Sequence, residues 1–215
     1  MDSKLPVISL FSGAGGLDLA VEFAGGTVDE PMPGPLRVAV ATDYEADALR
    51  TFSENFPDVP TVLRDIRALP TEELLEVAGL RKGEPTLVIG GPPCTPFSKS
   101  GFWISEKRES RDPNASLLDE FVRVVAESKP EAFVLENVQG LTYSTHAKQF
   151  KRLIKQLEEL GYNPRYKVLL AADYGVPQLR RRVFVIGRRD GVPFIFPEAT
   201  HSGISERDKR VDPTK

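Results

Sequence analysis

The stretch Thr86-Leu-Val-Ile-Gly-Gly-Pro-Pro-Cys94 indicates how the chain is built. Its apolar run, residues 86–89, is bounded by turn-forming residues, which is typical of a buried strand. Two glycines end the run, and the prolines that follow exclude both a helix and a central strand. Cys94 is therefore predicted to lie in a stiff loop just beyond the carboxyl end of a strand, where open α/β sheets bind ligands.

Cys94 is the only cysteine in the chain and admits two interpretations. A lone cysteine is often a small buried hydrophobic residue. The neighbours of Cys94 are instead prolines, followed by a polar stretch over residues 98–114. A loop of that length is more often functional than inert. We therefore interpret Cys94 as a nucleophile.

The length and composition are those of a globular protein with one domain, or with one domain and a fragment of another. The chain has 215 residues, of which 40% are hydrophobic and 27% are charged. A single cysteine excludes an intramolecular disulfide and suits a reducing compartment, so we expect a cytoplasmic protein. The sequence shows neither a signal peptide nor an apolar run near the roughly 18 residues of a membrane span. Its net charge of −3 is unusual for a free-standing nucleic-acid binder.

Another strand, turn and helix are predicted near the amino end. Residues 5–11 are apolar and lead into Ser-Gly-Ala-Gly-Gly at residues 12–16, after which a helix runs to Gly25. This order is typical of a nucleotide-binding α/β unit, because glycine lets the backbone approach a ligand closely. The spacing departs from the full dinucleotide fingerprint, since Asp18 stands where a third glycine would be.

The rest of the chain alternates strands with helices. This pattern predicts an α/β fold with a mostly parallel sheet and helices on both faces. Further strands are predicted at residues 37–41, 61–63, 132–135, 166–170 and 178–186. Further helices are predicted at residues 44–55, 69–80 and 146–160, with another that begins at residues 112–113. We predict one domain over residues 1–197 and a polar tail or linker over residues 198–215.

Several titratable residues lie at the ends of predicted elements. Asp43 can accept hydrogen bonds from a ribose diol or cap the next helix, and the two roles are compatible. Asp65 and Ile66 follow the third strand and offer an acceptor and an apolar wall to an adenine. Glu136 is either a partly buried acid with a raised pKa or the cap of a turn. His146 is predicted to be exposed at the start of its helix and to have no catalytic role.

Three consecutive arginines stand in the last predicted strand. Alternation would place Arg180 and Arg182 on one face of this strand and Arg181 on the other. Two arginines on one face either bind an anion or are simply solvated. The pattern alone leaves both interpretations open.

Four motifs follow one another along the chain. They are Phe-Ser-Gly-Ala-Gly-Gly from residue 11, Gly-Gly-Pro-Pro-Cys from residue 90, Glu-Asn-Val from residue 136 and Gln-Leu-Arg-Arg-Arg from residue 178. Their order and spacing closely resemble those of the cytosine-5 DNA methyltransferases over about residues 6–190. The resemblance implies a Rossmann-like S-adenosylmethionine-dependent methyltransferase fold. It implies that the cofactor is bordered by Phe11, Gly13, Gly15, Gly16, Leu17, Asp43, Tyr44, Asp65, Ile66 and Leu117.

The resemblance also implies catalytic roles for four residues. Cys94 would add as a thiolate to cytosine C6, so that C5 can attack the methyl group of S-adenosylmethionine. Glu136 would share a proton with cytosine N3, and Arg182 would hold the cytosine O2. Arg180 would support the loop and the thiolate. No metal and no membrane is implied.

Double-stranded DNA is the substrate that the resemblance implies. A cytosine inside a duplex is out of reach, so the target base would be flipped out. Residues 98–114 would close over it, with Lys107, Arg108 and Arg111 near phosphates.

The sequence departs from the family in one respect. The family continues into a target-recognition domain and then returns to the first domain with a final strand and helix, and neither region is present here. We therefore expect a second polypeptide or a missing carboxyl-terminal half to supply these regions. Without that part, we expect the chain to bind the cofactor weakly and to methylate little. The alternatives are a non-catalytic or decayed S-adenosylmethionine-binding subunit and a transfer-RNA cytosine-5 methyltransferase. A nicotinamide-dependent dehydrogenase would leave the proline–cysteine loop unexplained.

Overall fold

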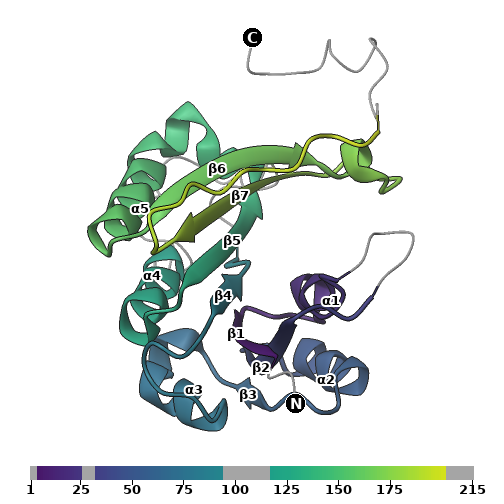
Figure 1. The fold of residues 1–215 in the computed structure, drawn as a ribbon, viewed down its shortest axis with the longest axis vertical. Coiled ribbons are helices and arrows are strands. Elements are labelled where there is room, and N and C mark those ends of the chain that lie inside the picture. Colours follow the sequence, from purple (N-terminus) through teal and green to yellow (C-terminus); the bar gives the residue numbers. More distant parts are fainter. Residues whose placement is uncertain (1–3, 26–31, 94–116, 202–215) are drawn as a thin grey trace, which may run out of the picture.

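A computed structural model describes residues 4–25, 32–93 and 117–201 of the chain (Figure 1). These residues form one sheet with the strand order β3-β2-β1-β4-β5-β7-β6. Strands β1 to β5 pair in parallel, and β7 runs antiparallel between β5 and β6. The strands are β1 (Leu5–Leu10), β2 (Leu36–Asp43), β3 (Thr61–Leu63), β4 (Leu87–Gly90), β5 (Ala132–Val138), β6 (Asn163–Leu170) and β7 (Arg181–Arg188).

Helices lie on both faces of the sheet (Figure 1). Helices α1 (Gly16–Glu22) and α2 (Ala46–Asn55) cover one face, beside β1 to β3. The other face is covered by α3 (Thr71–Val77), α4 (Leu117–Ser128) and α5 (Ala147–Glu159). This arrangement confirms the predicted α/β fold with a mostly parallel sheet. None of the helices described is long and apolar enough to cross a membrane.

The hydrophobic core has two parts, because successive side chains of a strand point to opposite faces of the sheet. Val7 of β1 packs on the α1 and α2 side, whereas Ile8 packs on the α3 to α5 side. On that second side, Phe133 meets Phe121 and Tyr162 edge-on, with ring centroids 6.1 and 5.3 Å away. Aromatic side chains of this size bury about 150–250 Å² each, so these rings anchor α4 against β5.

The structure places two predicted features differently. Strand β7 begins at Arg181, so Arg180 precedes it and does not share a strand face with Arg182. The backbone of Arg180 is held in a turn instead, where its amide donates to Gln178 O over 2.9 Å. His146 is buried, with 8% of its surface exposed, because the 3-10 helix Ser144–His146 turns it inward ahead of α5. The prediction that His146 is exposed is therefore wrong.

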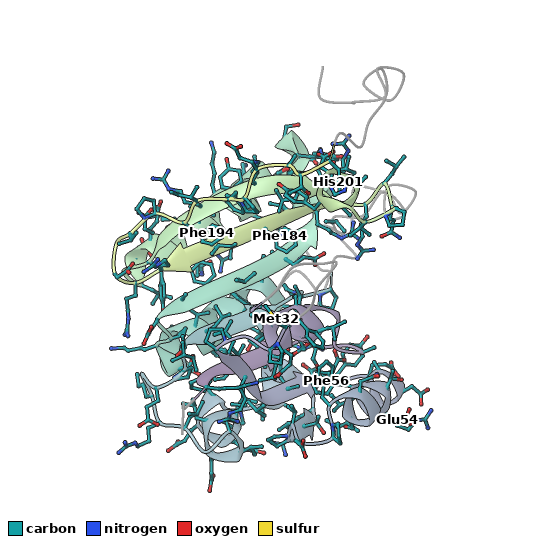
Figure 2. The ribbon with its side chains drawn as sticks, turned by 45° about the vertical axis from the view of Figure 1, so that its right-hand side comes forward. Met32, Glu54, Phe56, Phe184, Phe194 and His201 are labelled. Carbon is teal, nitrogen blue, oxygen red and sulfur yellow. The ribbon has the colours of Figure 1, made fainter. Side chains whose placement is uncertain are left out.

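The segment after β7 runs back over the sheet. Figure 2 shows Phe184 of β7 and Phe194 of this segment over the same face. The Thr200 and His201 amides both donate to Asp173 O over 3.0 Å, which fixes the end of the segment. Residues 198–201 of the predicted tail are thus attached to the domain, and residues 202–215 lie outside the described residues. The domain limit at residue 197 stays a prediction.

Asp18 is a buried carboxyl group on α1, beneath the glycine turn. Its surface is 0% exposed, and neither carboxylate oxygen has a hydrogen-bond partner among the residues described. Burial raises the pKa of Asp18 to about 6, although the nearby Ser9 side chain favours the charged form. An ionised carboxylate without a partner is costly in such a place, so ionisation of Asp18 opposes folding.

We expect Asp18→Asn to stabilise the protein above pH 6. The folded-state pKa of about 6 exceeds the ordinary value of 3.8, so the contribution of Asp18 to stability is largest below pH 3.8 and is lost as the pH rises through 6. A difference of two pKa units corresponds to about 3 kcal/mol, which is the upper bound of the gain. Urea unfolding at pH 5 and pH 8 measures it.

The exposed variant Asp47→Asn on α2 serves as the control and is expected to show no such pH-dependent gain. A free energy of unfolding lower than wild type for Asp18→Asn at pH 8 would mean that the carboxylate has a stabilising partner.

Candidate active site

The sequence motifs converge at one edge of the sheet. Parallel pairing places Leu10 of β1 beside Thr42 and Gly90, and Gly90 beside Leu135. The residues that follow β1, β2, β4 and β5 therefore leave the sheet at the same edge. Strand β7 reaches this edge with its amino end, because Arg182 pairs with Val138.

The glycine turn after β1 is shaped by the carboxylate at the end of β2. The Gly13 amide donates to Asp43 Oδ2 over 2.8 Å, and the Glu45 amide donates to Asp43 Oδ1 over 2.9 Å. Asp43 does not cap α2, whose N-cap residue is Glu45. Phe11 has a φ of 53°, a left-handed conformation that residues other than glycine rarely adopt. Backbone strain of this kind concentrates at functional sites.

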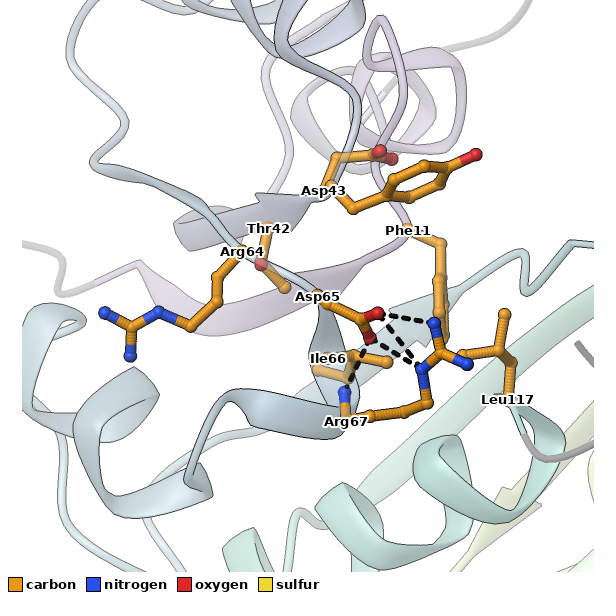
Figure 3. A pocket seen from close by; sticks show the side chains of 9 residues that line it. Phe11, Thr42, Asp43, Arg64, Asp65, Ile66, Arg67 and Leu117 are labelled. Atoms are coloured by element: carbon orange, nitrogen blue, oxygen red, sulfur yellow. Dashed lines mark hydrogen bonds and ion pairs between the residues drawn. The ribbon is translucent and has the colours of Figure 1, made fainter. Parts of the chain in front are cut away.

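A pocket of about 120 Å³ lies at the ends of β2 and β3 (Figure 3). Its lining contains six residues predicted to border a cofactor, which are Phe11, Asp43, Tyr44, Asp65, Ile66 and Leu117. Thr42, Arg64 and Arg67 complete the lining. Two carboxylates among apolar walls suit a ligand that combines an aromatic ring with hydrogen-bond donors.

The other four residues of that prediction lie outside the pocket lining. Gly13 adjoins it through its bond to Asp43. Gly15 and Gly16 line a larger hollow of about 740 Å³ between α1 and α2, and Leu17 packs against the core. A Cβ atom on Gly15 would lie 2.4 Å from the Phe56 ring, so this glycine is needed for helix packing. We assign the ligand site to the smaller pocket, because the strand-end carboxylates line it.

Arg67 is paired with one of these carboxylates. Its Nε lies 3.0 Å from both oxygens of Asp65, and its Nη2 lies 2.5 Å from Oδ2 (Figure 3). These bonds lower the pKa of Asp65 below its usual range, so the group stays ionised at neutral pH. Both side chains are about 40% exposed, at 43% and 39%, and an exposed ion pair of this kind stabilises a protein by at most ~1 kcal/mol. A ligand can therefore replace Arg67 at modest cost.

A second acid–base pair lies on β5 and β7. Arg182 Nε is 2.9 Å from Glu136 Oε1, and the two side chains are only 24% and 21% exposed. Burial raises the pKa of Glu136, and the positive charges of Arg182 and Arg180 offset part of this effect. Of the two interpretations of Glu136, the structure supports a partly buried acid with a raised pKa.

The turn after β4 lies directly against this pair. A Cβ atom on Gly91 would be 3.2 Å from Glu136 Oε2, so glycine leaves room for the carboxylate. Cys94 itself, and residues 98–114 with Lys107, Arg108 and Arg111, lie outside the described residues. In the parts of the chain that are described, no cluster of three or more His, Cys, Asp or Glu side chains could hold a metal ion.

Known proteins are similar to this chain in sequence and in fold. The family model of the C-5 cytosine-specific DNA methylases matches residues 5–212. The chain belongs to this family. The type II methyltransferase M.SacI of Streptomyces achromogenes is 69% identical over 217 residues, which are 100% of this chain and 56% of that protein. M.AquIA of a Picosynechococcus strain is 39% identical over 99% of this chain and 82% of its own length.

Solved structures in the comparison support the same fold. A prophage-encoded E. coli protein described as a candidate DNA modification methyltransferase gives a TM-score of 0.70 with 29% identity, over 86% of this chain and 47% of that one. A mutant of Spodoptera frugiperda DNMT2 gives a TM-score of 0.65 with 22% identity, over 92% of this chain and 54% of that one, and shows the fold alone. The chain thus spans about half the length of M.SacI and of these two structures.

Sequence reasoning missed two residues of this candidate site. Arg67 follows Asp65 by two residues, and that spacing could have suggested a local ion pair. Asn137 sits inside the Glu-Asn-Val motif, and its side chain donates to Pro92 O over 3.2 Å. No sequence signal could have found this bond, because it joins positions 45 residues apart.

We expect Arg182→Ala to raise the pKa of Glu136 further. The guanidinium favours the charged carboxylate, so its loss leaves burial as the dominant influence. Titration of the Glu136 carboxyl carbon by NMR measures the shift. Arg188→Ala is the control, because Arg188 also lies on β7 but pairs with Asp190. It should leave the Glu136 pKa unchanged. A downward or absent shift in Arg182→Ala would contradict the ion pair.

Proposed function

We propose that this chain is the catalytic part of a DNA (cytosine-5-)-methyltransferase of a type II restriction–modification system. It transfers a methyl group from S-adenosylmethionine to C5 of a flipped-out cytosine. The observation that carries the proposal is the Glu136–Arg182 pair lying against the Gly91-Pro92 turn, which leads within two residues to Cys94. A protein with this function would act in the cytoplasm, where bacterial DNA is found.

The side chains that line the pocket at the ends of β2 and β3 suit the adenine and ribose of S-adenosylmethionine. Asp43 offers carboxylate oxygens to the ribose hydroxyls, and Asp65 offers an acceptor to the exocyclic amine of adenine. Phe11, Ile66 and Leu117 form apolar walls for the ring, as the lining of the pocket supports. Tyr44 packs against the adenine. When bound, the cofactor supplies an electrophilic methyl group on a sulfonium.

Cys94 is the covalent catalyst in this proposal. Its thiolate forms a bond to cytosine C6, and the electrons of the C5–C6 double bond make C5 nucleophilic. C5 then takes the methyl group, whose bond to the sulfonium breaks and leaves a neutral thioether. Loss of the C5 proton to a base and cleavage of the S–C6 bond restore the aromatic ring and the free thiolate. Each step conserves atoms and electrons, with water as the base that takes the C5 proton.

Glu136 and Arg182 handle the charge that develops on the pyrimidine. Addition of the thiolate makes N3 more basic, and an acid with a raised pKa can share its proton there. Arg182 Nε faces Glu136 and its Nη1 donates to Arg181 O, so Nη2 is the nitrogen that donates to cytosine O2, where negative charge grows. Arg180 adds positive charge near Glu136, which also favours the thiolate.

In this proposal, polypeptide other than these 215 residues recognises the DNA bases. M.SacI carries the rest of its chain outside this region, since the match covers 56% of its length. We propose that a further part of the chain or a second polypeptide reads the sequence of double-stranded DNA. A target cytosine must leave the duplex to reach Glu136, and unstacking costs a few kcal/mol that protein contacts to DNA must offset.

Cofactor binding is expected to depend on Asp43. In Asp43→Asn one carboxylate oxygen becomes an NH₂ group, so either the Gly13 amide or the Glu45 amide loses its acceptor, and the ribose hydroxyls lose the charged acceptor. Loss of a hydrogen bond to a charged group reduces affinity about 10- to 100-fold. Calorimetry with S-adenosylhomocysteine measures this, and Asp47→Asn on exposed α2 is the control. Heat of binding with NAD but none with S-adenosylhomocysteine would favour the dehydrogenase alternative.

Covalent trapping tests the role of Cys94. A duplex that contains 5-fluorocytosine should form a stable adduct with the protein, the cofactor and the recognition part together, because fluorine cannot leave C5 as a proton does. We expect Cys94→Ser to form no adduct on a denaturing gel, and ordinary cytosine DNA to form none that persists. An adduct in Cys94→Ser would refute the proposal, and trapping on transfer RNA but not on DNA would favour the RNA alternative.

A further inference from the structure

The side chain of Asn137 ties the end of β5 to the turn after β4. Asn137 is 1% exposed and makes hydrogen bonds with both ends of its amide group. Its Nδ2 donates to Pro92 O over 3.2 Å, and its Oδ1 accepts from the Val138 amide over 2.9 Å. The second bond fixes the side-chain rotamer, so that the first is aimed at Pro92.

Pro92 O needs a donor from a side chain. The pairing of β4 with β5 ends at Gly90 and Leu135, so Pro92 lies beyond the backbone ladder. Neither Pro92 nor Pro93 has an amide hydrogen, so the ladder cannot continue through them. A buried carbonyl without a donor costs about 1–3 kcal/mol, which the Asn137 amide avoids.

We propose that Asn137 is a positioning residue for Cys94. It touches neither substrate nor cofactor and acts through Pro92. Two residues of chain span at most about 7 Å, and the ring of Pro93 fixes one of the few backbone torsions between Pro92 and Cys94. Anchoring the Pro92 carbonyl therefore fixes the backbone at a point only two residues before Cys94. This inference rests on the proposed function, since it requires Cys94 to be the nucleophile.

The neighbouring residue gives the anchor its significance. Glu136 precedes Asn137 on β5, and its side chain points to the opposite face of the strand, where it meets Arg182. The end of β5 thus has two roles. Glu136 supplies the carboxyl that shares a proton, and Asn137 holds the turn that leads to Cys94. A shift of about 1 Å between two reacting groups can cost about 100-fold in rate, so a rigid link between them is worth keeping.

Three variants separate the parts of the Asn137 contact. Asn137→Asp keeps the acceptor for the Val138 amide and removes the donor to Pro92. Asn137→Ala removes both, and Asn137→Ser keeps a polar group that is too short to reach Pro92. Asn163→Ala is the matched control, because Asn163 Nδ2 also donates to a backbone carbonyl, Gly191 O at 3.1 Å, far from the site.

The single cysteine gives a direct readout that a merely structural role would not change. Alkylation by iodoacetamide across pH 5 to 10 reports the pKa and the reactivity of Cys94 alone, with Cys94→Ser as the blank. We expect the Cys94 pKa to lie below about 8.5 in wild type and in Asn163→Ala, and to rise toward that value in the Asn137 variants. Methyl transfer with the recognition part present should lose about 100-fold in kcat, with KM values within about twofold.

The outcomes distinguish this inference from the proposed function. Variants that melt at a lower temperature but keep the wild-type alkylation profile and kcat would show that Asn137 is only structural, and would overturn the inference. A fully active Cys94→Ser would overturn the proposed function instead. If Asn137→Ala does not fold, Asn137→Asp and Asn137→Ser carry the test, and S-adenosylhomocysteine binding at wild-type affinity establishes that they are folded.

Discussion

The parallel pairing of β4 with β5 is the constraint on which the site depends. Its last pair, Gly90 with Leu135, releases both strands at the same level of the sheet. Gly91 and Glu136 therefore leave the ladder side by side, and the missing side chain of Gly91 gives the Glu136 carboxylate its place. The next residue along β5, Asn137, holds the turn that follows β4. The acid and the loop thus take their relative position from one stretch of backbone pairing.

Two carboxylates at this edge are each paired with an arginine, but their pKa values are shifted in opposite directions because Glu136 is the more buried of the two. Asp65 is 39% exposed, and the bonds from Arg67 lower its pKa, so it stays an ionised acceptor. Glu136 is 21% exposed, and burial raises its pKa despite Arg182. An acceptor for cofactor groups needs the first behaviour, and a group that shares a proton needs the second. A carboxylate paired with an arginine thus has a lowered pKa after β3 and a raised one on β5, at the same edge of the sheet.

The sequence predicted what depends on local pattern and missed what depends on distant contacts. Apolar runs located the strands, and β3 was predicted with its observed bounds, because a buried strand is visible in its own residues. The alternation of Arg180 and Arg182 suggested one strand face, but β7 begins at Arg181, and the Arg180 amide donates to Gln178 O in the turn before it. His146 is polar by type, yet the fold buries it. The Asn137 bond to Pro92 joins two strand ends that only the folded sheet brings together.

The glycine turn after β1 carries two unfavourable features that the rest of the sheet must sustain. Phe11 adopts a left-handed backbone conformation, and such strain costs about 1–3 kcal/mol. Asp18, a few residues later, is buried without a partner among the described residues. Both lie next to β1, which pairs with β2 on one side and β4 on the other, so its position is determined from both flanks. A strand paired on both flanks holds a strained turn more firmly than an edge strand would, and the turn beside the pocket at the ends of β2 and β3 follows such a central strand.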